Sequence, residues 1–145
     1  MGKNIEIISE LYGEFSKGDI PAVLNKLADN VEWEVCNIET DTQKAGVPWL
    51  QPRRGKDGAA GFFEIVGKFD FKKFDVLSMT ESENQVAAVL RIAAEVTPGG
   101  GFFDSEEVHM WTFNDEGKII RYRHYMDGSS HIAAARGERS AGAAA

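Results

Sequence analysis

The stretch VHMWTFNDEGKIIRYRHYMD, residues Val108–Asp127, decides the fold that this sequence predicts. Two runs rich in β-branched and aromatic residues flank the polar segment NDEG, and this pattern is typical of a β-hairpin. We place Asp115 and Glu116 at the centre of the turn, which fixes the register of the two strands. Two of the three histidines of the chain lie in this hairpin, so the register decides whether they face the same way.

In this register, one face of the hairpin carries two imidazoles and a carboxylate. The strand pairs expected on that face are His109 with Tyr122, Trp111 with Ile120, Glu107 with His124, and Ser105 with Met126. Successive side chains of a strand alternate between two faces, so the charged and mixed set points outward. A slip of one residue would send the side chains of one strand to the opposite face.

The inward cluster is a candidate acid–base site. Glu107 could hold the imidazole of His124 in one tautomer, and His109 on the diagonal could accept or donate a proton. We therefore take His124, His109 and Glu107 as candidate catalytic residues. The alternative is that the histidines are satisfied core residues, or that one of them reaches solvent at the rim. Two imidazoles and a carboxylate can also bind zinc or iron, but neighbours on adjacent strands seldom converge without further support. We predict no metal and no cofactor.

Three helices are expected before the last four strands. Apolar residues from Ile5 to Phe15 recur at three- and four-residue steps, and Gly18 can end this first helix. Asp19 is a typical N-cap for a second short helix that ends near Asp29 and Asn30. A third helix is expected to begin at an Asp57 N-cap, where its two internal glycines would allow close packing.

The strand signals follow a simple order. VEWEVC, residues Val31–Cys36, alternates apolar and polar positions, and we interpret Cys36 as a packing residue of this strand. An irregular connection from Asn37 to Lys56 carries an isolated Trp49. Four consecutive strands are then predicted at Phe71–Ser82, Gln85–Thr97, Phe102–Phe113 and Lys118–Met126.

This order predicts an α+β domain. We expect a cone-shaped, curved antiparallel or mixed β-sheet, with the three helices of the N-terminal half on its concave face. The domain would span residues 1–127, with a flexible C-terminal tail at residues 128–145. An apolar pocket is expected between sheet and helices. Its expected substrate-binding walls are Trp33, Trp49, Trp111, Tyr122, Tyr12, Phe62 and Met126.

Composition excludes several classes of protein. The 145 residues suit one domain, and the formal net charge of −7 argues against nucleic-acid binding. No run approaches the roughly 20 apolar residues that a bilayer crossing needs, so we expect no membrane partner. A single cysteine cannot form an internal disulfide, which favours a reducing, cytoplasmic location.

The chain resembles the nuclear transport factor two superfamily, which includes ketosteroid isomerases, limonene epoxide hydrolases and SnoaL-like polyketide cyclases. The markers are GDIPAVLNKLADNVEW, RGKDGAAGFFEIVG and FNDEGKIIRYRHYMD, in the order and spacing of that superfamily. The resemblance covers Ile5 to about Asp127. It implies the cone fold, a homodimer formed through the outer sheet face, and a small apolar or aromatic ligand.

The catalytic residues of these relatives do not carry over as a set. Trp33 stands where ketosteroid isomerases have their aspartate base, and Leu11 stands where they have an oxyanion-binding tyrosine, one residue before Tyr12. The arginine and aspartate positions of limonene epoxide hydrolases are Val86 and Ala88 here. His109 and His124 instead occupy the two family site positions on the last two strands.

The sequence therefore leaves three functions open. The first is a cofactor-independent, isomerase- or cyclase-like proton transfer on a small, largely apolar carbonyl or polyketide-like substrate. His124 would be the base, Glu107 would orient it, and His109 or Tyr12 would steady the developing oxyanion. The second is a non-catalytic protein that binds a small hydrophobic ligand in the same pocket. The third is a fully packed core in a dimeric interaction domain.

Overall fold

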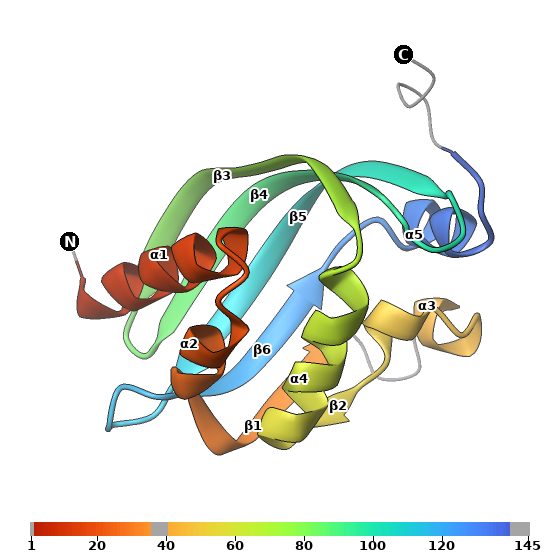
Figure 1. Ribbon diagram of the computed structural model, residues 1–145. Helices are drawn as coiled ribbons and strands as arrows, with labels where there is room; N and C mark the ends of the chain where they lie inside the picture. The colour runs from red at the N-terminus through yellow and green to blue at the C-terminus, as the bar shows by residue number, and fades with distance from the viewer. Residues whose placement is uncertain (1, 36–40, 140–145) are drawn as a thin grey trace.

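The computed structural model describes residues 2–35 and 41–139 and has the expected α+β architecture (Figure 1). The helical elements are α1 (Lys3–Ser16), α2 (Ile20–Asn25), α3 (Asp41–Lys44), the 3-10 turn η1 (Pro48–Leu50), α4 (Gly55–Val66) and α5 (Gly128–Ala135). The strands are β1 (Leu27–Val35), β2 (Arg53–Arg54), β3 (Asp70–Ser82), β4 (Gln85–Glu95), β5 (Phe102–Phe113) and β6 (Ile119–Tyr125). Together they form one open sheet in the order β2-β1-β6-β5-β4-β3.

The sheet is mixed, as predicted. Strands β3 to β6 form an antiparallel meander. Strand β1 pairs parallel with β6, and β2 pairs antiparallel with β1. In Figure 1, α1, α2 and α4 lie across one face of this curved sheet, which confirms the predicted cover of its concave side. The core lies between these two layers.

The first two helices have the predicted apolar faces, but the second is shorter than predicted. Helix α1 buries Ile8, Leu11 and Tyr12. Asp19 caps α2, since its side chain accepts a hydrogen bond from the backbone N–H of Ala22. Leu27, which falls within the predicted span of this helix, instead lies in β1 and is buried.

Helix α4 begins at Gly55, so the prediction of an N-cap at Asp57 is wrong. Its internal glycines do allow close packing. A Cβ atom on Gly61 would lie 2.7 Å from Nη1 of Arg53, and one on Gly58 would lie 3.1 Å from Cβ of Arg53. The glycines therefore leave room for the Arg53 side chain beside α4.

The C-terminal hairpin has the predicted facing but not the predicted register. His109 pairs with His124, and Trp111 pairs with Tyr122. The turn is longer than two residues: Gly117 has φ 80°, and the side chain of Asn114 accepts hydrogen bonds from two backbone N–H groups of the turn. A register shift between Thr112 and Phe113 follows.

The C-terminal segment needs a correction. Residues 128–145 were expected to be a flexible tail, but residues 128–135 form α5, which contacts β5 and α3. His131 and Ala134 are buried there. Beyond the helix, the N–H of Phe102 donates to the carbonyl of Glu138 at 2.9 Å. Apolar contacts and backbone hydrogen bonds therefore dock this segment on the domain.

Cys36 and residues 37–40 of the long connection lie outside the described residues; the rest of that connection contains α3, η1 and β2. Among the described residues, no helix combines the length and apolar character needed to cross a membrane. The homodimer stays a prediction; Val108, Met110 and Tyr125 are partly exposed on the outer sheet face.

A carboxylate from the β3–β4 hairpin caps the first helix. Oε1 of Glu81 accepts a hydrogen bond from the backbone N–H of Ile5 at 3.1 Å, and the N-cap residue Gly2 has no side chain to do so. Because an anion at a helix N-terminus is stabilising, Glu81→Gln is expected to lower the free energy of unfolding by about 0.5 kcal/mol. Urea denaturation at low salt measures this, with Glu83→Gln in the same hairpin as the matched control. Equal effects of the two substitutions would contradict the capping role.

Candidate acid–base site in an aromatic cavity

A cavity of about 70 Å³ lies between the sheet and the helices. Its walls are mainly aromatic, with one carboxylate and three imidazoles at one side. The lining residues are Leu11, Tyr12, Phe15, Trp33, Trp49, Phe62, Phe63, Val66, Phe69, Phe71, Phe74, Ile92, Phe103, Glu107, His109, Trp111, Tyr122, His124 and His131.

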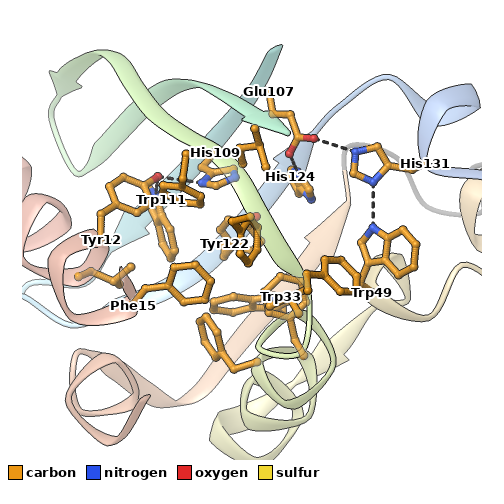
Figure 2. Close-up of a pocket in the computed structure, with 18 of the residues that line it drawn as sticks. Tyr12, Phe15, Trp33, Trp49, Glu107, His109, Trp111, Tyr122, His124 and His131 are labelled. Atoms are coloured by element: carbon orange, nitrogen blue, oxygen red, sulfur yellow. Dashed lines mark hydrogen bonds and ion pairs between the residues drawn. The ribbon is translucent and has the colours of Figure 1, made fainter. Parts of the chain in front are cut away.

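Glu107 is the centre of the polar side of this cavity. It projects from β5, is 2 % exposed, and lies opposite the end of β6. Its Oε1 is 2.5 Å from Nε2 of His124. Its Oε2 is 2.7 Å from Nε2 of His131 and accepts a hydrogen bond from Oγ of Ser105, also at 2.7 Å. The carboxylate is therefore held from several sides, as Figure 2 shows for the two imidazoles.

The tautomer of His131 follows from its second partner. Nε1 of Trp49 lies 2.8 Å from Nδ1 of His131. An indole N–H can only donate, so Nδ1 of His131 accepts and its proton is on Nε2. That proton points at Glu107. The chain of hydrogen bonds runs from Trp49 through His131 to Glu107 (Figure 2).

Glu107 keeps its charge in spite of burial. Burial by itself raises the pKa of a carboxyl, but the electrostatic interaction and hydrogen bond with His124, together with the hydrogen bond of His131, outweigh it. The pKa of Glu107 is held well below its ordinary value. The cavity thus contains a fixed negative charge next to His124.

A second hydrogen-bonded group lies beside this one, between α1 and β5. Nε1 of Trp111 donates to the hydroxyl oxygen of Tyr12 at 3.1 Å, and that oxygen lies 2.8 Å from Nδ1 of His109. Burial, reinforced by the electrostatic interaction with His124, lowers the pKa of His109 to about 3, and burial raises the pKa of Tyr12. The hydroxyl of a neutral Tyr12 can donate its proton to Nδ1, and in that arrangement neutral His109 carries its own proton on Nε2.

Two polar atoms of the lining residues have no hydrogen-bond partner in the described part of the chain. They are Nδ1 of His124 and Nε1 of Trp33, and both are buried. Buried polar groups are nearly always paired, and an unpaired one costs about 1–3 kcal/mol. These atoms therefore mark where a bound molecule could form hydrogen bonds.

Glu107, His109 and His124 each offer one possible metal ligand atom, and these atoms lie within 4.8 Å of one another. A metal ion would have to compete for Oε1 of Glu107, which His124 contacts at 2.5 Å, and Oε2 already accepts from His131 and Ser105. The carboxylate of Glu107 is therefore arranged to pair with imidazoles, and the three possible ligand atoms do not form a preformed metal site.

The structure brings together almost all the residues that the sequence singled out. His124, His109 and Glu107 lie on the inner face, and the predicted wall residues other than Met126 line the cavity. Met126 is a correction: β6 ends at Tyr125, and Met126 packs against the core without lining the cavity. Tyr12 points inward and contacts His109, so the rotation of α1 about its own axis decides that this hydroxyl reaches the site.

Sequence reasoning missed His131, the bond from Trp49, and the contact of Ser105 with Glu107. A signal for His131 was present, since Asp127 followed by Gly128, Ser129 and Ser130 is typical of a helix start. The small apolar residues that follow are equally compatible with a frayed tail, so this signal alone did not predict a docked helix.

Residues 8–122 match a protein family described as the SnoaL-like domain. No curated protein matches the chain. Among solved structures, an NTF2-like protein of unknown function from Burkholderia pseudomallei is 20% identical over 92% of this chain and 98% of that chain, with a TM-score of 0.77. TerC, co-crystallised with polyporic acid, is 22% identical over 92% and 98%, with a TM-score of 0.73. A protein from Bacillus subtilis named as a candidate isomerase is 18% identical over 94% and 95%, with a TM-score of 0.72. At these identities the likeness shows the fold alone.

Proposed function

Because the chain belongs to the SnoaL-like domain family, we propose that it transfers a proton on a small, largely apolar carbonyl or polyketide-like substrate, without a cofactor. The reaction would be of the isomerase or cyclase type. His124 is the base, Glu107 orients it, and His109 steadies the oxygen on which charge develops. The name of the Bacillus subtilis neighbour as a candidate isomerase supports this reaction class.

One observation carries the proposal. His124 donates from Nε2 to a buried, ionised Glu107 at 2.5 Å, while its Nδ1 is buried and has no partner among the described residues. A carboxylate that fixes one nitrogen of an imidazole leaves the lone pair of the other free, and it stabilises the imidazolium that forms on protonation. This is the arrangement that a general base requires.

The proton transfer can be written with these groups. Nδ1 of His124 takes a proton from the carbon next to the substrate carbonyl, and the electron pair of that C–H bond forms an enolate. The neutral imidazole of His109 donates a hydrogen bond from Nε2 to the enolate oxygen, as an oxyanion donor does. His124 then returns the proton to another carbon. The free N–H of Trp33 can hold a further substrate oxygen.

Cavity size and lining restrict the substrate. About 70 Å³ with mainly aromatic walls suits one ring with few polar groups. A larger ligand would have to displace the partly exposed phenylalanines, of which Phe15, Phe71 and Phe74 pack against one another with ring centroids 5.5 to 5.8 Å apart. A one-ring ketone is therefore the suitable first probe.

Conversion of cyclohex-3-en-1-one to its conjugated isomer tests the proposal. The reaction moves one proton from the carbon next to the carbonyl to the end of the double bond, and conjugation raises ultraviolet absorbance. We expect the protein to accelerate it beyond free imidazole at equal concentration. The His109→Asn, His124→Asn double variant should lose this acceleration, and Tyr125→Phe on the outer sheet face should keep it.

The same experiment distinguishes the binding alternative. Trp33, Trp49 and Trp111 line the cavity, so a bound ketone should change tryptophan fluorescence. Saturable fluorescence change without conversion would replace the enzyme by a non-catalytic binding protein. Equal conversion by the parent and the double variant would remove His109 and His124 from the chemistry.

A further inference from the structure

We propose that α5 completes the site, and that His131 is a positioning residue whose imidazole joins Trp49 to Glu107 and so holds the carboxylate against His124. The inference rests on the proposed function for its effect on rate, but its geometry stands independently. It assigns a positioning role to the C-terminal segment, which lies beyond residues 8–122 that match the family.

Both ring nitrogens of His131 are used within the protein. Nδ1 accepts from Trp49 at 2.8 Å and Nε2 donates to Glu107 at 2.7 Å (Figure 2). Neither nitrogen is left to exchange a proton with a substrate. His131 therefore acts through Glu107, whose other oxygen contacts His124. Without this donor, the buried carboxylate would lose one of the bonds that fix its rotation.

His131 is itself held rigidly. Its side chain is 1 % exposed, and its ring centroid lies 4.1 Å from that of Phe103 at an interplanar angle of 30°. A group with fixed orientation can set the orientation of its partner, whereas a mobile one cannot. Trp49 extends this support to the 3-10 turn η1, so segments far apart in sequence converge on one carboxylate.

The docking of α5 depends on a close approach of backbones. A Cβ atom on Gly101 would overlap the carbonyl oxygen of Ala134, so α5 can lie this close only over a glycine. The N–H of Phe102 and the carbonyl of Glu138 bond at 2.9 Å next to this contact. Displacing α5 at Gly101 should withdraw His131 without changing any polar residue of the site.

Two matched substitutions separate positioning from mere packing. The oxygen of asparagine lies where Nδ1 of histidine lies, so His131→Asn keeps the acceptor for Trp49 and loses the donor to Glu107. The nitrogen of glutamine lies where Nε2 lies, so His131→Gln keeps the donor and loses the Trp49 bond. We expect His131→Asn to slow conversion of cyclohex-3-en-1-one roughly 10-fold, as loss of a partner to a functional group does. His131→Gln should stay near the parent rate.

The pH at which Glu107 takes up a proton gives a second readout. A hydrogen bond from His131 favours the ionised form of Glu107 and lowers its pKa. Loss of this bond should make Glu107 take up a proton at higher pH in His131→Asn and not in His131→Gln. Gly101→Ala should behave like His131→Asn. Equal protonation pH values of Glu107 in the Asn and Gln variants would overturn the proposal.

A measurement without substrate keeps this test separate from the proposed function. Infrared difference spectra across a pH titration report the pH at which Glu107 protonates, with Glu107→Gln identifying its band. A higher protonation pH in His131→Asn supports the positioning role even if the parent does not convert the ketone. An unchanged protonation pH overturns it, whatever the rates are.

Discussion

Replacing His124 by glutamine is expected to slow conversion of cyclohex-3-en-1-one by about 10²–10⁴-fold, the range that a general base contributes. The nitrogen of the glutamine amide can take the place of Nε2 and still donate to Glu107, which lies 2.5 Å from Nε2 in the parent. The substitution therefore removes the free lone pair of Nδ1 and little else. Initial rates at saturating ketone measure the effect.

The stability of the variant is the control for this result. Because the bond to Glu107 is retained, the urea midpoint of His124→Gln should stay close to that of the parent. Ketone binding, followed by tryptophan fluorescence, should also persist. A variant that folds, binds and converts the ketone at the parent rate would mean that Nδ1 of His124 is not the base.

The facing of the two hairpin histidines could be predicted because it changes only when the register shifts by an odd number of residues. The turn was assumed to have two central residues, but Gly117 at φ 80° makes it longer, and this moves the register by one residue. The irregularity at Thr112 and Phe113 moves it by one more. Two shifts of one residue restore the same faces, so His109 and His124 still point inward although their partners changed.

Long-range contacts could not be predicted from the pattern. Periodicity places Tyr12 on the apolar face of a helix, but only the packing of α1 over β5 brings its hydroxyl to His109. Likewise, α5 is stabilised by its contact with Gly101 and by burial of His131, not by helix propensity within its short sequence. Local sequence predicted the strands and helices; tertiary packing decided which polar groups meet.

The stability of the protein should fall as the pH is lowered from 7 to 4.5, because His109 is buried as a neutral group. Burial first, and the electrostatic interaction with His124 second, lower its pKa to about 3 in the folded state, against about 6.5 in the unfolded chain. Between these values the unfolded chain binds the extra proton, so the free energy of unfolding decreases with decreasing pH. The contribution of His109 lost by pH 4.5 is about 2.5 kcal/mol.

The variant His109→Asn isolates this effect, since its oxygen can still accept the proton of Tyr12. Of the groups around the imidazole, His124 and Glu107 are present in both proteins, and the raised pKa values of Tyr12 and Tyr122 keep both phenols neutral throughout. The lowered pKa of Glu107 confines its own effect to pH values below about 4.5. Urea denaturation at pH 7, 6, 5 and 4.5 should therefore give converging stabilities. The free energy of unfolding of the parent should fall by about 2.5 kcal/mol more than that of the variant over this range. Parallel curves would show that the imidazole of His109 is charged, or reaches water, in the folded protein, and a charged His109 could not act as the neutral donor to the enolate oxygen.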